Sequence, residues 1–229
     1  MQVLITGGNK GLGLSLAQYL DKLGYDLIII GRSEFSFKFT NKMTYISEDL
    51  TNINNILNKI KNYKIDIIIN NAGLGFIGKS EDCPNLVDIN IKALVELSKY
   101  AIKNNIKLLN ISSIGAILPG ININDYYTSK AFVYLYTKNL WYEYKKHTIS
   151  VALPGPLNTE FNKRHGYNDD ANYYDKDMVA KIIINQFLKG KKKIIPGFKI
   201  KLLYLFRNLI PTPILAHFVS KSQLKKVKK

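Results

Sequence analysis

The sequence predicts an α/β fold with three layers, in which helices cover both faces of a doubly wound parallel sheet. Short apolar runs alternate with amphipathic helical segments over residues 2–160, and most runs are apolar almost throughout, as in strands buried on both faces. Gly, Asn and Ser cluster just after these runs, at the strand ends where ligands bind such sheets. We therefore expect a sheet of the Rossmann type.

The individual elements follow from the spacing of the apolar residues. The expected strands are residues 2–6, 25–30, 43–46, 65–69, 107–111, 149–153 and 193–196. The expected helices are residues 14–20, 53–60, 86–104, 126–145 and 177–188. The chain has 229 residues, of which 46% are hydrophobic, so we expect residues 1–229 to form a single domain with one sizeable core.

A glycine-rich turn follows the first expected strand and leads into a helix. Residues 6–13 read Thr-Gly-Gly-Asn-Lys-Gly-Leu-Gly. Glycines in this context let the backbone approach a pyrophosphate, and the new helix directs its free N–H groups toward it. A turn that merely connects strand and helix is the alternative. We expect a dinucleotide to contact this turn at Gly7, Asn9, Lys10, Gly11, Leu12 and Gly13.

The second strand ends at Gly31, Arg32 and Ser33, where a dinucleotide-binding unit meets the adenosine ribose. An acidic residue at this point would favour NAD. Arg32 can instead pair with a 2′-phosphate, and Lys10 is placed to reach the same group. We therefore expect NADP(H) in a site that includes Ser33, preferred over NADH by roughly tenfold to a hundredfold. Two solvated surface cations are the alternative.

Tyr126 and Lys130 lie four residues apart in an expected helix, so their side chains share one face. A phenol normally ionises near pH ~10, and an adjacent lysine cation lowers its pKa. We expect this pair to donate a proton to a carbonyl, and we consider it together with Ser113, which ends the fifth strand thirteen residues before Tyr126. A plain strand-end turn is the alternative for Ser113. Tyr127 is expected to pack in the interior, because the residue four positions later is Ala131.

In this order the motifs resemble those of the short-chain dehydrogenase/reductase family, over about residues 2–160. They are the glycine turn at 6–13, Asp49, Asn70-Asn71-Ala72-Gly73, Asn90, Ser113, Tyr126 with Lys130, and Pro154-Gly155 with Thr159. Residues 115–161 are most similar to a bacterial subgroup often labelled DltE-like. The similarity to this subgroup lies at residues 118–120, 126–127, 154–156 and 159–161.

The resemblance implies a mechanism in which Tyr126 is the acid/base, Ser113 binds the carbonyl oxygen and Lys130 lowers the tyrosine pKa while holding the nicotinamide ribose. It implies that Asn90 anchors a proton-relay water, although a role in bracing its helix is the alternative. Asp49 would contact the adenine and Thr159 the carboxamide of the nicotinamide. The other implied cofactor contacts are Leu50, Asn71, Ala72, Gly73, Tyr126, Pro154 and Gly155.

Composition bears on disulfides, metal sites, location in the cell and charged partners. The single cysteine, Cys83, and three histidines give no basis for a disulfide framework or a metal site. A first strand at residue 2 leaves no room for a signal peptide, so we expect a cytoplasmic protein. The net charge of +16 is spread along the chain except at 189–193 and 221–229. It is expected to reflect a solvated basic surface, with attraction to a membrane surface as the alternative, and no nucleic-acid partner is expected.

Two C-terminal regions are expected to determine the substrate. Residues 161–175 are expected to form a lid, and residues 198–229 form an apolar and basic extension. This extension is interpreted as two short helices that cover the pocket or a subunit contact, with a membrane-surface anchor as the alternative. The resemblance suggests a homodimer or homotetramer through the helices at 126–145 and 177–188.

The predicted activity is hydride transfer between NADP(H) and a small-molecule carbonyl or secondary alcohol. The alternatives are an NADPH-binding regulatory protein without turnover and a membrane-surface reductase of lipid-like ketones. The sequence leaves the substrate itself open.

Overall fold

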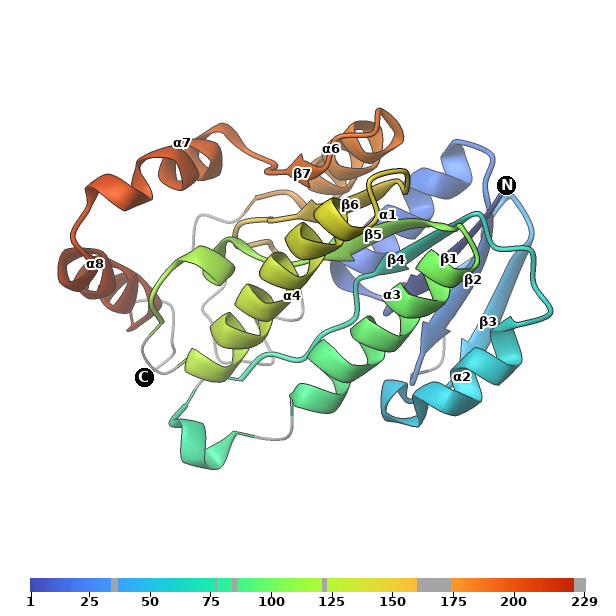
Figure 1. The fold of residues 1–229 in the computed structure, drawn as a ribbon, viewed down its shortest axis with the longest axis horizontal. Coiled ribbons are helices and arrows are strands. Elements are labelled where there is room, and N and C mark those ends of the chain that lie inside the picture. Colours follow the sequence, from blue (N-terminus) through green and yellow to red (C-terminus); the bar gives the residue numbers. More distant parts are fainter. Residues whose placement is uncertain (34–36, 77, 84–85, 121–122, 160–173, 225–229) are drawn as a thin grey trace.

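The computed structural model has a parallel β-sheet between two layers of helices (Figure 1). It describes the chain except for residues 34–36, 77, 84–85, 121–122, 160–173 and 225–229. Within the described residues the sheet has seven strands in the order β3-β2-β1-β4-β5-β6-β7. The strands are β1 (Gln2–Thr6), β2 (Asp26–Gly31), β3 (Met43–Ser47), β4 (Ile67–Asn70), β5 (Lys107–Ile111), β6 (Ile149–Ala152) and β7 (Lys193–Ile194). The predicted doubly wound parallel sheet is confirmed.

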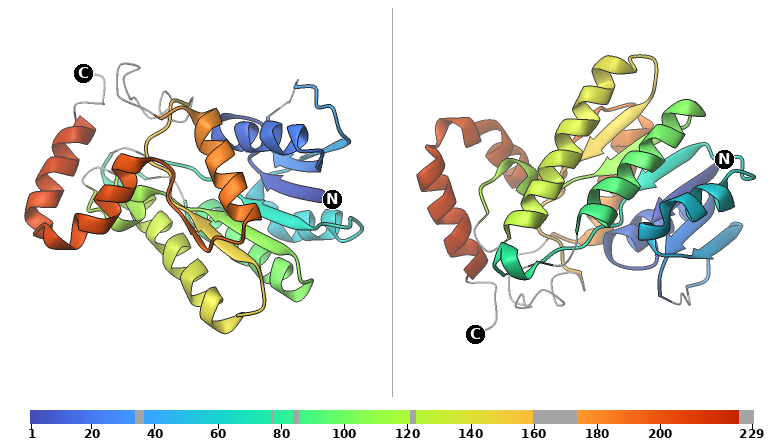
Figure 2. Two further views of the ribbon diagram at one scale, coloured as in Figure 1. Left: turned by 90° about the horizontal axis from the view of Figure 1, so that it is seen from above. Right: turned by 60° about the horizontal axis from the view of Figure 1, so that its bottom comes forward.

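Continuous apolar runs form these strands because the sheet is covered on both faces. The helices are α1 (Gly11–Lys22), α2 (Ile53–Ile60), α3 (Ala93–Lys103), α4 (Asn124–Glu143), α6 (Lys176–Leu188), α7 (Phe198–Phe206) and α8 (Thr212–Leu224). One core joins α1 and α6 to the sheet, and a second core joins α2, α3 and α4 to the opposite face (Figure 2). Along β1, Val3 and Ile5 enter the first core and Leu4 enters the second.

Most expected elements agree with the structure to within two residues, but the expected helix over residues 86–104 is divided. A π-helical segment, Asp88–Lys92, precedes α3. Such segments insert an extra residue into a helical turn and are frequent at functional sites. Here the segment contains Asn90, whose side chain is buried.

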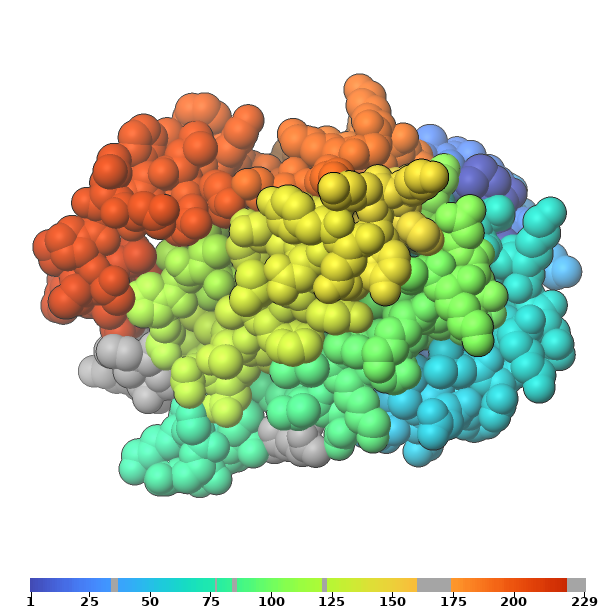
Figure 3. All heavy atoms as spheres, viewed as in Figure 1, coloured from blue at the N-terminus to red at the C-terminus, as the bar shows by residue number. Residues whose placement is uncertain are grey.

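The expected pair of C-terminal helices is present as α7 and α8. A short 3₁₀ turn, Arg207–Leu209, follows α7, and prolines at 211 and 213 prevent the two helices from joining into one. In the space-filling view the pair forms the end of the molecule opposite β3 (Figure 3). The expected lid over residues 161–175 lies outside the described residues except for its last two positions.

Tyr204 of α7 links the pair to the body of the protein. The Tyr204 hydroxyl lies 2.9 Å from the Tyr134 hydroxyl of α4 and accepts a 2.8 Å hydrogen bond from the Lys193 ammonium of β7. The cationic groups of Lys193 and Arg207 lie 4.4 and 4.3 Å from the centre of the Tyr204 ring. No helix among the described residues has both the length and the apolar character needed to cross a bilayer.

Candidate active site

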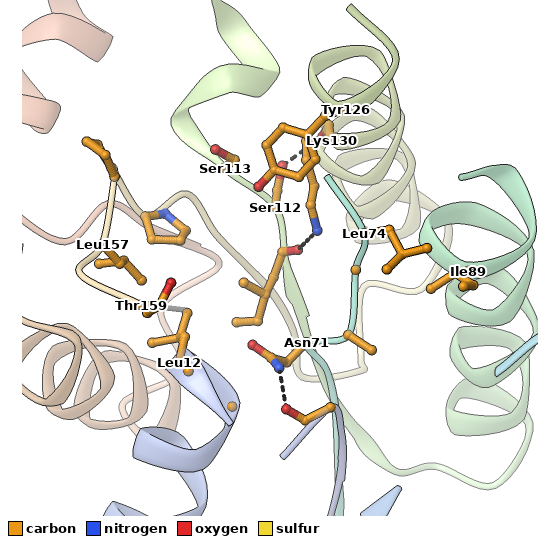
Figure 4. Close-up of a pocket in the computed structure, with 18 of the residues that line it drawn as sticks. Leu12, Asn71, Leu74, Ile89, Ser112, Ser113, Tyr126, Lys130, Leu157 and Thr159 are labelled. Atoms are coloured by element: carbon orange, nitrogen blue, oxygen red, sulfur yellow. Dashed lines mark hydrogen bonds between the residues drawn. The ribbon is translucent and has the colours of Figure 1, made fainter. Parts of the chain in front are cut away.

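A pocket of about 610 Å³ opens beyond the carboxyl ends of the central strands. Its lining includes each predicted cofactor residue and the predicted catalytic residues other than Asn90 (Figure 4). Those lining residues are Gly7, Asn9, Lys10, Gly11, Leu12, Gly13, Arg32, Ser33, Asp49, Leu50, Asn71, Ala72, Gly73, Ser113, Tyr126, Lys130, Pro154, Gly155 and Thr159. Motifs that are scattered along the sequence therefore meet in one cavity.

The glycine turn is shaped so that main-chain atoms face the pocket. Gly7 has a φ of +65°, which favours glycine. A Cβ on Gly13 would lie 2.1 Å from the Gly7 oxygen, so only glycine allows this approach. The Asn71 amide secures the turn by donating to the oxygens of Thr6 (3.1 Å) and Gly7 (3.2 Å). No side chain caps the first turn of α1, and its N–H groups suit a pyrophosphate.

The end of the pocket that is predicted to bind adenosine is polar and open to solvent. Asn9 donates to the Ser33 hydroxyl at 2.8 Å, and the Tyr45 hydroxyl donates to the Ser33 main-chain oxygen at 2.5 Å. Arg32 pairs with Asp49 at 3.3 Å. The hydrogen bond from the Thr51 amide lowers the pKa of Asp49, with a further contribution from Arg32, so this carboxyl is ionised at neutral pH. Because the pair is exposed, it costs little to break, and Arg32 remains available to a phosphate.

The opposite end of the pocket contains the predicted proton donor. Ser113 and Tyr126 are joined by a hydrogen bond, and Ser113 also accepts from the Gly115 amide at 3.1 Å. Figure 4 shows the Tyr126 ring directed toward Ser113. Burial raises the pKa of Tyr126 to about 12, and the hydrogen bond from Ser113 offsets only part of this effect. The predicted lowering of the tyrosine pKa is therefore wrong in this structure, since removing the phenol from water outweighs other influences.

Lys130 lies behind Tyr126 and is almost completely buried. Its ammonium lies 5.8 Å from the centre of the Tyr126 ring and donates to the Ile111 oxygen at 3.1 Å. Burial lowers the pKa of Lys130 to about 8, because the low-dielectric interior disfavours the charged form. At neutral pH Lys130 is therefore a buried cation whose pKa lies only slightly above the pH. Its ammonium also lies close to the Tyr126 phenol.

Asn90 braces the site from behind and does not line the pocket. Its amide exchanges hydrogen bonds with the main chain of Leu74, at 2.8 and 2.9 Å, and donates to the Ser129 hydroxyl at 3.0 Å. These contacts link the π-helical segment to α4 and to the chain that follows β4, and none of them caps the helix that contains Asn90. A Cβ on Gly73 would lie 3.1 Å from the Lys130 ammonium and 3.3 Å from Asn90 Oδ1. The role of Asn90 as a water anchor remains a prediction.

The apolar wall of the pocket beside Tyr126 was not predicted from the sequence. This wall comprises Leu118, Ile123, Ile200, Leu203, Leu215, Phe218 and Val219. Five of these residues belong to α7 and α8, whose apolar character was visible but gave no indication of which side chains face inward. Pocket lining by these helices supports their interpretation as a cover.

Comparison with known proteins agrees with this geometry. The family model for the short chain dehydrogenases matches residues 1–170. The 3-oxoacyl-[acyl-carrier-protein] reductase FabG of Rickettsia typhi is 35% identical over 181 residues, which cover 70% of this chain and 74% of that protein. The 3-ketodihydrosphingosine reductase of Bacteroides thetaiotaomicron is 28% identical over 210 residues, which cover 84% of this chain and 75% of that protein.

The fold also matches solved structures. A short-chain dehydrogenase from Sphingobium yanoikuyae, solved with NADPH, superposes with a TM-score of 0.79 at 22% identity and covers 90% of this chain and 93% of that one. The narrower similarity to the DltE-like subgroup is not confirmed. The match over residues 1–170, together with the relative from Rickettsia typhi, shows that this chain belongs to the short-chain dehydrogenase/reductase family of oxidoreductases, which act on CH–OH and carbonyl groups.

Proposed function

We propose that this protein is an NADPH-dependent reductase of a ketone or aldehyde, which runs in reverse as an alcohol dehydrogenase. The observation that supports this proposal most strongly is the Tyr126 hydroxyl. It is hydrogen-bonded to Ser113 in the pocket, with the Lys130 ammonium behind it. A protein that only bound a dinucleotide would have no need of a proton donor at this place.

Each of the three side chains has a distinct task in the proposed reaction. When bound, NADPH supplies the hydride that reaches the carbonyl carbon. Tyr126 supplies the proton that the carbonyl oxygen takes up, so that C=O becomes CH–OH, and Ser113 stabilises the charge on that oxygen. A pKa of about 12 keeps Tyr126 protonated at neutral pH, as a proton donor must be. Lys130 stabilises the phenolate that remains, and water then returns its proton.

The residues around the pocket fit a dinucleotide with a 2′-phosphate. The α1 turn would hold the pyrophosphate, and Arg32 with Lys10 would hold the 2′-phosphate. Asp49 and Leu50 would contact the adenine. At the other end, Lys130 would contact the nicotinamide ribose. The remaining proposed contacts at that end are Asn71, Ala72, Gly73, Pro154, Gly155 and Thr159.

Cofactor choice is tested by titrating the purified protein with NADPH and NADH while following thermal unfolding. We expect NADPH to stabilise the protein at roughly tenfold to hundredfold lower concentration. Arg32→Ala should abolish most of this preference and Lys10→Ala should weaken it, whereas NADH binding should change little. A wild-type preference for NADH would contradict the assignment of NADPH but leave the reductase proposal standing.

The chemistry is tested with Tyr126→Phe, measured as NADPH oxidation over a panel of ketones and aldehydes. The variant should lose at least about a hundredfold in kcat, because it removes the proton donor, while its NADPH affinity stays within a few-fold. Tyr127→Phe is the matched control, because the Tyr127 ring packs against Gly115 and Gly120 and is buried. Full turnover in Tyr126→Phe would refute the mechanism. Binding of NADPH without turnover in the wild type would favour the regulatory alternative.

The names of the two relatives indicate a class of substrate. One is named as a reductase of 3-oxoacyl-[acyl-carrier-protein] and the other as a reductase of 3-ketodihydrosphingosine. The pocket of this chain places the apolar wall from α7 and α8 beside Tyr126. An aliphatic chain next to the reacting carbonyl is therefore the substrate feature that we propose.

A further inference from the structure

The charge of this protein is distributed unequally along the chain. Cations occur throughout, but none of the 17 Asp and Glu residues follows Asp177, whereas 13 of the 33 Lys and Arg residues do. The last 52 residues therefore have a formal charge of +13 out of the total of +16. A uniform compositional bias toward Lys would not remove acidic residues from this region alone. The C-terminal region therefore carries most of the net positive charge of the protein.

The same region exposes large apolar side chains. Phe198, Leu202, Leu205 and Phe206 of α7 have exposed fractions of 78%, 45%, 61% and 50%, and Leu209 after the helix has 76%. These residues lie on the face of α7 away from Ile200, which is buried against the body of the protein. A helix that is apolar on both sides is normally buried on both sides. The outer face of α7 therefore lacks a covering layer in the described part of the chain.

The helix pair also forms a wall of the pocket. Ile200 and Leu203 of α7 and Leu215, Phe218 and Val219 of α8 line the cavity. Phe218 lines the pocket and is also 64% exposed, so it stands at the boundary between the cavity and the surface. An apolar molecule that meets the outer face of the pair is therefore close to the cavity that contains Tyr126.

Cations surround this apolar face. Lys199, Lys201 and Lys221 are exposed, and Arg207 lies partly exposed against the Tyr204 ring. Apolar side chains that enter the acyl region, flanked by lysines that reach anionic headgroups, are the combination with which interfacial helices bind membranes. The pair is too short to span a bilayer, so it would lie in the plane of the interface.

We propose that α7 and α8 dock this protein on an anionic lipid surface, from which a ketone with a hydrocarbon chain enters the pocket past Phe218. The docking half of this proposal is independent of the activity, and the substrate half rests on the proposed function. The Tyr204 contacts with α4 and β7 would keep α7 fixed to the body while its outer face meets the lipid.

A second copy of the chain fits this face less well than a lipid surface. Two such faces in contact would bring two regions of strong positive charge together, which costs free energy. Nucleic acid or an acidic carrier protein would match the charge but would not require five large exposed apolar side chains. An anionic lipid surface satisfies both the charge and the apolar residues.

The docking is tested by sedimentation of the full chain with phosphatidylcholine vesicles, with and without phosphatidylglycerol. We expect strong binding only to the anionic vesicles, and a large loss of binding as salt is raised well above ~0.1 M. The variant Leu205→Glu/Phe206→Glu should bind at least roughly tenfold more weakly, because it places charge in the apolar interface. Leu23→Glu is the matched control, since Leu23 is 44% exposed and follows α1 on a different part of the molecule.

Three outcomes would overturn the docking proposal. They are equal sedimentation with neutral and anionic vesicles, unchanged binding of the double variant, and a double variant that dissociates into monomers while vesicle binding is retained. The last result would assign the face to a second copy. Lys199→Ala/Lys201→Ala provides a second variant that leaves the apolar residues intact, and it should lower binding to anionic vesicles without changing the unfolding temperature.

Entry of the substrate from the lipid surface is tested by measuring activity in the presence of vesicles. We expect kcat/KM for a long-chain ketone in anionic vesicles to fall at least roughly tenfold in Leu205→Glu/Phe206→Glu. For a short, water-soluble ketone it should stay within about twofold of the wild type, because Tyr126 is untouched. Equal losses on both substrates would overturn the lipid route. Activity on neither substrate, with vesicle binding intact, would leave the docking in place and count against the proposed function.

Discussion

Lys130 illustrates how burial changes the chemistry of a single residue. In water its amine would ionise near 10.5, but in the protein its pKa is lowered to about 8 because the side chain is almost fully buried. Between these two values the unfolded chain binds more protons than the folded chain. As the pH rises through this window, Lys130 therefore increases the free energy of unfolding.

This effect predicts a pH-dependent difference between the wild type and Lys130→Met. From pH 8 to pH 10 the wild type should gain about 2 kcal/mol of unfolding free energy relative to the variant, because the cost of burying the cation disappears as the amine loses its proton. Urea denaturation of both proteins at pH 8, 9 and 10, without cofactor, measures the difference. A constant difference over this range would show that Lys130 keeps its ordinary pKa.

At the scale of elements, the turn between β1 and α1 depends on the lack of a side chain at residue 13. A Cβ there would lie 2.1 Å from the Gly7 oxygen and 2.4 Å from the Asn71 amide nitrogen. Gly13→Ala must therefore shift the start of α1 away from the turn. We expect it to weaken NADPH binding at least roughly a hundredfold, because the helix N–H groups no longer converge on the pyrophosphate.

The control for this variant is Gly24→Ala. Gly24 also has a positive φ, of +83°, but a Cβ there would meet nothing within 4 Å. It should cost about 1 kcal/mol of stability through backbone strain and leave the NADPH dissociation constant unchanged. Isothermal titration of both variants separates a local effect on the turn from general destabilisation. Similar NADPH affinities in the two variants would contradict the role assigned to Gly13.

The elements that form the cofactor site could be predicted from sequence because each depends on local pattern. The apolar strands, the glycine turn and the positions of Ser113 and Tyr126 are all set by residues close together in the chain. The direction of the Tyr126 pKa shift was not predictable in this way, since it depends on burial by distant residues. The sequence predicted that Asn90 lies in a helix. Its hydrogen bonds to Leu74 and Ser129 could not be predicted, because only folding brings these residues next to it.

At the scale of the whole molecule, the exposed face of α4 indicates how copies would assemble. Phe132, Leu135 and Tyr142 on this helix are 39%, 57% and 70% exposed. We propose a dimer or tetramer that buries this face, as the sequence suggested for this helix and α6. Leu135→Arg should convert the assembly to monomers, because an unpaired charge would be buried at its centre.

Light scattering coupled to gel filtration measures this change, with Leu23→Glu as a control on an unrelated exposed leucine. A wild-type protein that is monomeric at all accessible concentrations would refute the proposed assembly. Because the α4 face and the α7–α8 face are separate surfaces, Leu135→Arg should not affect binding to anionic vesicles.

The place of β1 in the sheet has a consequence for biosynthesis. Among the strands of this sheet β1 comes earliest in the chain, and it lies in the interior of the sheet, paired with β2 on one side and β4 on the other. It can therefore serve as the template on which the sheet grows outward in both directions as the ribosome delivers the chain. The glycine turn precedes the other pocket residues in the chain, whereas α7 and α8 come after them. The helices that we propose to select the substrate therefore follow, in the chain, the residues that form the rest of the pocket.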